Sequence, residues 1–289
     1  MLANFSAPDH RSHSYTARFQ FDQHVMPRSI LARILWLQGF HGQAMRTAED
    51  AIQAALEANH AILTCSVLCH AACPIALWIG DFAMADRHLK ILLDHATRYT
   101  LPLWRELGRM FEGLLAVSRG NVVDGLRLLR TGSDELGESL PPSVYLKFQS
   151  DIAEALGRAG QIPEGLTVVE QAIERYEQTN ERWLFAELLR LKGELMLREG
   201  SATAKAEDSF REARDWACRQ GALSWELRAA TSLAHLLRDQ HRFVEAIAVI
   251  KPVYNRLTEG FGLTDLTNAK ALIDNLRRVY RSEKSNWPL

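Results

Sequence analysis

Three cysteines follow one another at four-residue intervals, at Cys65, Cys69 and Cys73, with His70 between them. Cysteine thiolates and histidine nitrogens are ligands that zinc prefers. On one helix, however, this spacing extends over about 12 Å along the axis, whereas each thiolate bound to zinc lies about 2.3 Å from the ion. The three cysteines therefore cannot share one ion, and we expect them to pack as small apolar side chains.

Motifs for hydrolysis or group transfer are missing from the sequence. It contains no G-x-S-x-G elbow, no H-E-x-x-H helix and no G-x-x-x-x-G-K-[ST] phosphate loop. The pair His10 and His13 has no second pair of ligands to complete a metal site. Carboxylates are plentiful, as is typical of solvated helix surfaces. We therefore predict no catalytic residue, no metal and no cofactor.

The composition is that of a folded helical protein. Of 289 residues 47% are hydrophobic, only 17 are Gly and 9 are Pro, and 34 Lys and Arg nearly balance 35 Asp and Glu. This balance gives no overall field toward nucleic acid or an anionic membrane. Four cysteines are too few for a disulfide framework. Because no apolar run approaches the ~18 residues of a membrane span, we expect a cytoplasmic protein without a membrane or nucleic-acid partner.

Single residues at a spacing of about 40 divide the chain into similar units. Each follows a stretch of helical periodicity, where a residue with positive φ commonly ends a helix. The six positions are Gly39, Gly80, Gly120, Gly160, Gly200 and His241.

Two columns of small residues keep the same spacing. Seven residues before each turn stand Ala32, Cys73, Gly113, Ala153, Gly193 and Ala234. Five residues after each turn, or six after Gly200, stand Ala44, Ala85, Gly125, Gly165, Ala206 and Ala246. Small residues at a fixed position let helices approach closely. Because one hairpin cannot bury its apolar face alone, the pattern predicts an all-α, right-handed solenoid of stacked antiparallel hairpins.

The predicted boundaries follow from the turns. We expect a flexible or irregular segment over 1–26, six hairpins over 27–259, and a capping helix with a tail over 260–289. The first helices should cover 27–38, 60–79, 102–119, 142–159, 181–199 and 222–239. The second helices should cover 42–58, 81–99, 121–137, 162–178, 203–219 and 242–258, before a last helix near 264–281. Pro74 and Pro252 lie inside predicted helices and should kink them.

The offsets within the units resemble tetratricopeptide repeats, most clearly from Gly193 through Ala206 and Phe210 to Ala213. The period of about 40 is longer than the usual 34. Longer stretches resemble the C-terminal repeat region of bacterial signal-transduction ATPases that carry winged-helix or nucleotide-cyclase domains. These stretches are RFQFDQHV (18–25), LARILWLQGF (31–40), ACPIALWIGD (72–81), ERWLFAELLRLKGELML (181–197), GALSWELRAATSLAHLLRDQ (221–240) and PVYNRLTEGFGLTDLTNAKALID (252–274). Only this sensor region of such proteins is matched.

The resemblance implies a concave groove lined by the first helix of each hairpin. Its ligand-facing positions would lie six and three residues before, and one residue after, the first small column. In this sequence they are His70, Lys147, Glu154, Glu187, Arg190, Glu194, Arg228 and His235. Arginines there could clamp a peptide carboxylate, and glutamates a basic group. Alternatively, these side chains pair with one another and only solvate the groove.

Tryptophans recur near the ends of the predicted first helices. Trp36 and Trp78 precede Gly turns, whereas Trp104, Trp183 and Trp225 stand near helix starts. We expect them to pack between repeats rather than to form an aromatic cage for a ligand.

Taken together, these features predict a non-catalytic scaffold that binds a protein or peptide segment or senses a small effector. The partner could be an ATPase or effector domain encoded nearby. Two alternatives remain open: an enzyme with its active site in the groove, and a non-functional fragment of a larger regulator.

Overall fold

The computed structural model describes residues 25–178, 182–200 and 203–285, so the predicted flexible segment 1–26 lies almost wholly outside the described residues. The described residues form helices and no strand. After a helix over residues 25–37 come α2 (His41–Glu57), α3 (Ala61–Val67), the π-helix η1 (Leu68–Ala72), α4 (Cys73–Trp78), α5 (Phe82–Arg98), α6 (Pro102–Ser118), α7 (Val122–Leu136), the 3₁₀-helix η2 (Gly137–Ser139), α8 (Pro142–Arg158), α9 (Ile162–Gln178), α10 (Phe185–Glu199), α11 (Thr203–Gln220), α12 (Leu223–Asp239), α13 (Phe243–Tyr254) and α14 (Thr264–Ser285).

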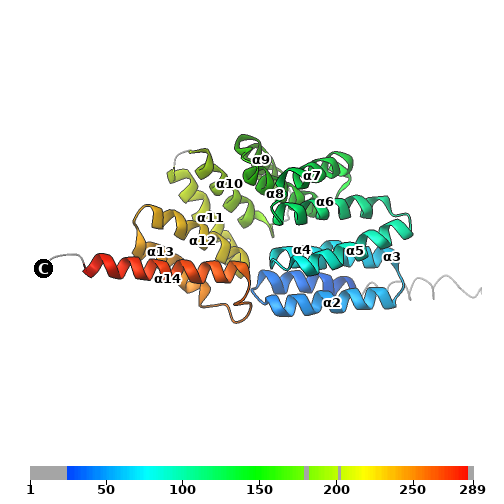
Figure 1. Cartoon of the computed structure of the whole chain (residues 1–289), viewed down its shortest axis with the longest axis horizontal. Helices are drawn as coiled ribbons and strands as arrows, with labels where there is room; N and C mark the ends of the chain where they lie inside the picture. Colours follow the sequence, from blue (N-terminus) through cyan, green and yellow to red (C-terminus); the bar gives the residue numbers. More distant parts are fainter. Residues whose placement is uncertain (1–24, 179–181, 201–202, 286–289) are drawn as a thin grey trace, which may run out of the picture.

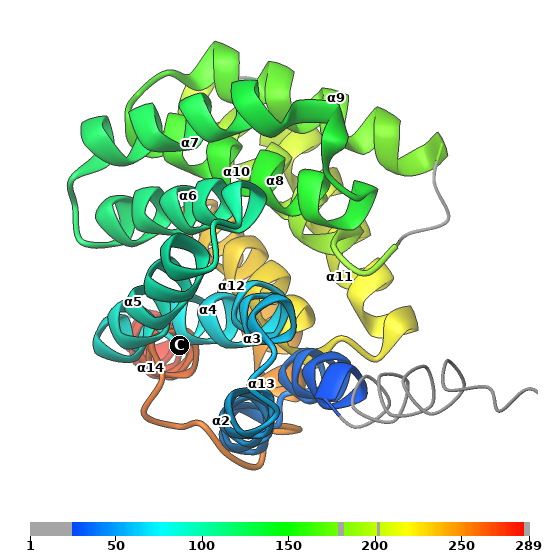
Figure 2. The ribbon, with the colours of Figure 1, turned by 90° about the vertical axis from the view of Figure 1, so that its right-hand side faces the viewer.

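Consecutive helices pack in antiparallel pairs. The pairs are residues 25–37 with α2, α3–η1–α4 with α5, α6 with α7, α8 with α9, α10 with α11, and α12 with α13. Figure 2 shows α4, α8, α10 and α12 toward the middle of the molecule, and α7, α9 and α11 on its outside. The predicted all-α solenoid of stacked helical hairpins is confirmed.

The turns between paired helices have the backbone that their spacing predicts. The φ angles at Gly39, Gly80, Gly120, Gly160 and Gly200 lie between 77° and 94°. His241 takes the same place at φ 60°, although a side chain makes this conformation costly. The 40-residue spacing therefore marks real helix ends.

The two small columns meet where the helices of a hairpin cross. Gly113 on α6 and Gly125 on α7 are so close that a Cβ on Gly125 would lie 2.5 Å from the Gly113 carbonyl oxygen. The alanines at the equivalent positions of the other hairpins are buried. Small side chains therefore fix the distance between the helices of each hairpin.

The kink predicted at Pro74 takes the form of a π-turn. Pro74 lacks the N–H that would continue the hydrogen-bond ladder. The backbone widens just before it, and the N–H of Cys73 bonds to the carbonyl of Leu68, five residues back. Pro252 lies inside α13, which ends two residues later.

The run Ala61–Trp78 corrects one prediction from the sequence. By length and composition this stretch is apolar enough to cross a membrane, although 72% of it is buried inside the protein. Its neighbours include α2, α5 and α6. Packing against these helices accounts for its hydrophobicity.

The superhelix brings its two ends together. The loop between α13 and α14 reaches α2, and α12 lies against the helix over residues 25–37 (Figures 1 and 2). Glu259 in this loop accepts hydrogen bonds from the N–H groups of Gly42 (2.8 Å) and Gln43 (3.2 Å). The sequence pattern did not predict this contact.

The close crossing of α6 and α7 can be tested with Gly125→Ala. The new Cβ would lie 2.5 Å from a backbone oxygen and 2.6 Å from Val117 Cγ2. We expect this overpacking to lower the free energy of unfolding by about 1–3 kcal/mol. This loss should exceed the ~1 kcal/mol by which alanine stabilises a helix relative to glycine. Urea unfolding followed by circular dichroism measures the change.

Gly165→Ala is the matched control, because Gly165 occupies the same column in the next hairpin and its Cβ would meet no atom closer than 3.3 Å. Its stability should change by less than about 1 kcal/mol. Equal losses in both variants would show that the close crossing is not the cause.

Candidate functional site

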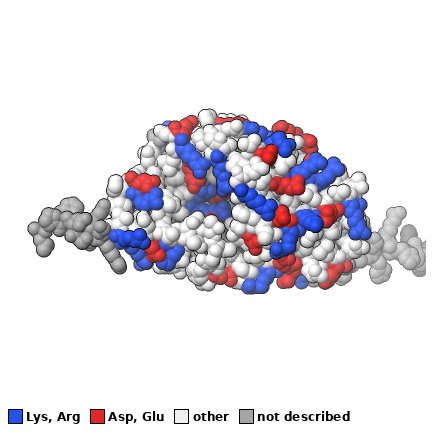
Figure 3. Space-filling model, viewed as in Figure 1, with Lys and Arg blue, Asp and Glu red and all other residues white. Residues whose placement is uncertain are grey.

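The inner helices line a cavity of about 920 Å³ that is open on one face of the molecule. Its wall combines the ends of α4 and α6 with the inner faces of α8, α10 and α12, and is completed by α14. Figure 3 shows a hollow near the middle of one face, where Lys and Arg side chains gather. A cavity of this size accommodates a drug-sized molecule or a short stretch of peptide.

Helix α14 lines the cavity as well as ending the stack. Thr264, Asn268, Ala271 and Asn275, which recur at helical spacing on one face, line the wall and are exposed. The asparagine amides can each donate and accept hydrogen bonds. The predicted capping role did not include this face. In the sequence, however, small or polar residues recur every three to four positions along this helix.

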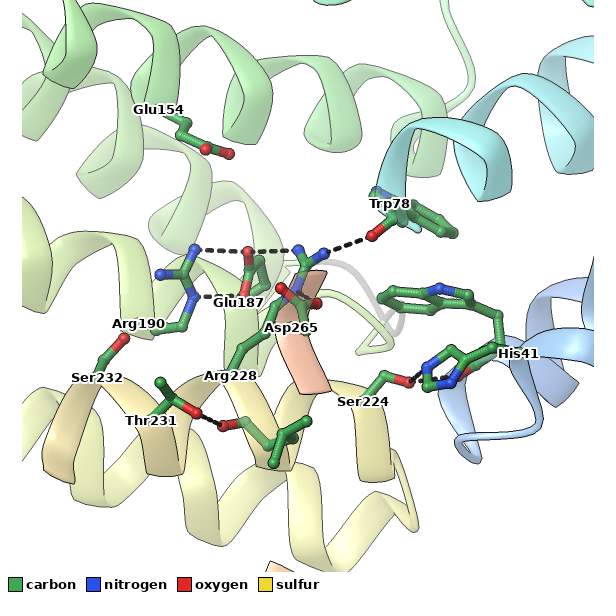
Figure 4. Close-up of polar contacts among 12 residues, drawn as sticks. His41, Trp78, Glu154, Glu187, Arg190, Ser224, Arg228, Thr231, Ser232 and Asp265 are labelled. Carbon is green, nitrogen blue, oxygen red and sulfur yellow. Dashed lines mark hydrogen bonds and ion pairs between the residues drawn. The ribbon is translucent and has the colours of Figure 1, made fainter. Parts of the chain in front are cut away.

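A cluster of buried ion pairs lies on α10. The guanidinium of Arg190 donates from Nε and Nη2 to the two oxygens of Glu187, both at 2.7 Å (Figure 4). Its Nη1 donates to Glu194 at 2.5 Å. Ser232 on α12 donates to the same oxygen of Glu194 at 2.9 Å. Burial opposes ionisation of Glu187, but Arg190 and Arg228 outweigh it and lower its pKa. The network is thus charged and internally paired at neutral pH.

Arg228 on α12 connects this network to the ends of the solenoid. Its Nε lies 2.6 Å from Asp265 on α14, and its Nη1 lies 3.4 Å from Glu187. Its Nη2 donates to the carbonyl of Trp78 at 3.1 Å. The guanidinium also lies over the rings of Trp36 and Trp225, 5.5 and 5.1 Å from their centroids. One side chain therefore connects α12 to four other helices.

Lys147 and Asp151 form a second pair on α8. Their charged atoms are 2.5 Å apart, and the ammonium lies 4.9 and 4.7 Å from the ring centroids of Phe111 and Phe148. Burial raises the pKa of Asp151 to about 6, although the charge of Lys147 lowers it. Asp151 was not among the predicted groove residues, because it lies one turn from the positions that the repeat offsets select.

The other predicted groove residues lie in different environments. Glu154 lines the cavity and bonds to Arg158 at 2.6 Å, with both side chains partly exposed. His235 also lines it, and burial lowers its pKa. His70 instead lines a separate pocket of about 30 Å³ and contacts the carbonyl of Ser66.

The structure therefore brings together most of the predicted residues. Lys147, Glu154, Arg190, Glu194, Arg228 and His235 line the cavity. Glu187 is buried behind them, where it anchors the two arginines. Whether any of these side chains contacts a ligand stays a prediction.

The cysteines have the environment of packed apolar groups. Cys65, Cys69 and Cys73 are buried free thiols. Burial raises the pKa of Cys65 to about 11 and that of Cys73 to about 12, and holds that of Cys69 well above its ordinary value. In the described part of the chain no cluster of His, Cys, Asp or Glu could hold a metal ion. The pair His10 and His13 lies outside that part.

Comparisons with known proteins support the architecture. No family model matches the sequence. An uncharacterized protein of Rhizobium meliloti (strain 1021) is 29% identical over 168 residues, which are 56% of this chain and 16% of that protein. The chain thus spans only a small part of the length of this curated relative.

Two solved structures share the arrangement of helices. The crystal structure of a Rap protein complexed with competence and sporulation factor matches with a TM-score of 0.59 and 12% identity, over 88% of this chain and 75% of that one. The crystal structure of apo RapI matches with a TM-score of 0.50 and 9% identity, over 89% and 99%. The fold is a tetratricopeptide-like solenoid. At these identities the likeness concerns the fold alone.

The raised pKa of Asp151 predicts a pH-dependent stability. Its pKa moves from 3.8 to about 6 on folding, so the folded chain binds more protons than the unfolded chain between these values, and stability falls as the pH rises through them. Asp151→Asn removes this term. Relative to the wild-type chain, the variant should gain about 2–3 kcal/mol between about pH 4 and about pH 7.

Urea unfolding of both chains across this range measures the difference. The opposite effect of Glu187, whose lowered pKa reduces stability in acid, is present in both chains and cancels. A stability difference that stays constant with pH would contradict the raised pKa of Asp151.

Proposed function

We propose that the chain is a non-catalytic binding scaffold whose central cavity takes a peptide or a protein segment. The cavity of about 920 Å³, lined by five hairpins and α14, carries this proposal. The Rap protein of similar fold was crystallised with competence and sporulation factor, which supports a binding role for this architecture. A small effector could occupy the same cavity instead of a peptide, and the test below distinguishes these two kinds of ligand.

The wall chemistry supports a peptide as occupant. In both Arg190 and Arg228, the nitrogens Nε, Nη1 and Nη2 each donate to a partner within the protein. Free hydrogen-bonding capacity lies in carboxylate oxygens of Glu154 and Glu194 and in the amides of α14. Peptide backbones and side chains supply matching donors and acceptors at short intervals along an extended chain. The fixed ion pairs keep the wall pre-organised, which lowers the cost of binding.

The biological setting follows from the same proposal. We propose that the chain acts as a cytoplasmic regulatory module, similar to the C-terminal repeat region of a signalling ATPase or transcriptional regulator. Its partner would be an ATPase or effector domain, contacted directly or in response to the cavity ligand. A non-functional fragment of such a regulator would bind no ligand, so the binding test also separates this alternative.

Asp151 favours a second candidate function. A carboxyl group with a pKa of about 6 beside an ammonium group has the properties of a general acid or base. An enzyme would show turnover of a substrate that Asp151→Asn abolishes without loss of substrate binding. A scaffold would bind its ligand unchanged and release it unaltered.

Glu154→Gln tests the proposed binding site. Peptides would be selected from a randomised library with the full chain, and their Kd measured by fluorescence anisotropy. Because Glu154 lines the cavity, we expect the substitution to weaken binding of the selected peptides about tenfold, equivalent to ~1.4 kcal/mol.

Glu164→Gln is the matched control. Glu164 forms a partly exposed pair with Arg130 at 2.6 Å, the same distance as Glu154 to Arg158, but it lies outside the cavity wall. Its variant should bind like the wild-type chain. Selection of no peptide, or equal affinity of all three chains, would contradict the proposal. Selection of small molecules instead of peptides would identify a small effector as the ligand.

A further inference from the structure

The contact between the two ends of the solenoid forms a seam. On one side lie the helix over residues 25–37, α2 and the end of α4, and on the other lie α12, the loop after α13 and the start of α14. The paired atoms belong to residues 150 to 217 positions apart in the chain. In a repeat protein each hairpin is stabilised mainly by its neighbours, so the hairpins on either side can stay folded when the seam separates.

Three tryptophans make the apolar part of the seam. The ring of Trp36 lies 4.4 Å from that of Trp78 and 4.7 Å from that of Trp225, centroid to centroid. Trp36 and Trp225 come from opposite sides, and each is only 1% exposed. Separation of the seam would expose both rings to water.

The polar part of the seam is incompletely satisfied. The hydroxyl of Ser224 donates to the carbonyl of Trp36, so His41 must donate from Nε2 to Ser224, at 3.0 Å. His41 Nδ1 is then a buried acceptor without a partner, and the buried Nε1 of Trp36 is a donor without one. Each such group disfavours the closed state relative to a hydrated one. These two atoms therefore lower the stability of the closed seam.

The same seam completes the cavity. Leu77, Trp78 and Gly80 from one side and Arg228 and Asp265 from the other line its wall. Arg228 crosses the seam to the Trp78 carbonyl while it also contacts Glu187 and Asp265 in the cavity. Separation of the two sides would therefore take the wall apart.

We infer that the seam is a reversible clasp, which opens as a unit while the hairpins remain folded and thereby widens the opening of the cavity. In the closed clasp His41 is neutral, since burial lowers its pKa. Opening hydrates the two unpaired atoms, releases Arg228 from Trp78, and uncovers the cavity wall between α4 and α14. The opening is a property of the chain itself, and only its use in ligand entry rests on the proposed function.

The test compares a seam variant with a matched control in the full chain without ligand. The seam variant, Ser224→Ala with Glu259→Ala, removes the hydroxyl bonded to His41 and Trp36 and the carboxylate bonded to α2. The control, Ser209→Ala with Glu164→Ala, removes a buried hydroxyl on α11 and the Arg130 pair, both away from the seam. Far-UV circular dichroism and hydrogen exchange of α6–α9 report whether the hairpins stay folded.

Two measurements report opening. Acrylamide quenching of tryptophan fluorescence should rise in the seam variant and not in the control, and small-angle scattering should give a larger radius of gyration. For access, Ser232→Cys in a Cys218→Ser background places a thiol in the cavity wall while removing the exposed native thiol. A bulky maleimide should label it about tenfold faster in the seam variant than in the control.

Each other outcome would overturn the clasp. Equal quenching and labelling in seam and control variants would mean that the ends do not separate independently. Loss of helix, or faster exchange throughout α6–α9 together with quenching, would mean that the seam opens only with global unfolding. A failure to select any peptide leaves these readouts intact, so the clasp and the proposed binding function are tested separately.

Discussion

The position of one buried guanidinium, that of Arg228, depends on closure of the whole superhelix. A charged group removed from water is costly unless partners surround it. Here the partners are the carboxylates of Glu187 and Asp265, the carbonyl of Trp78, and the faces of Trp36 and Trp225. They come from both ends of the chain and from α10 between them. If the solenoid were open, this guanidinium would lose the carbonyl of Trp78 and the ring of Trp36 but would keep its partners on α10, α12 and α14. Closure, the cavity wall and the place of α14 are therefore coupled through it.

Closure in turn limits how the repeats can vary. A solenoid grows by adding hairpins without a fixed end, and its pitch follows from small rotations between neighbours. In this chain the pitch must return the sixth hairpin to the first. The close crossing of Gly113 and Gly125 and the π-turn before Pro74 are two local departures from a uniform repeat.

The sequence predicted the local structure well because its signals are local. Positive φ at Gly80 or Gly160 depends only on the turn that ends a helix, and most helix boundaries follow within one or two residues. The seam could not be predicted in this way. The sequence indicates that Trp36 and Trp225 are buried, but it does not show whether they pack against each other or against residues near them in the sequence. The hydrophobic run Ala61–Trp78 was misjudged for a related reason: its burial depends on packing against α2, α5 and α6, which the local sequence does not show.

In the candidate site, too, the sequence predicted one property and missed another. It predicted which side chains point inward, but not how deeply each of them is buried. Repeat offsets select the helix face that turns inward, which is why six of the eight predicted residues line the cavity. They do not determine how far from the axis a side chain ends. Glu187 lies deep, where it pairs with two arginines, and His70, within the π-helix η1, lines a separate pocket. Asp265 and Asn268 come from α14, outside the repeats. A ligand would therefore meet a wall whose shape is set by closure and whose charges are already paired, so selectivity must come from the unpaired oxygens and amides at the surface of that wall, not from its net charge.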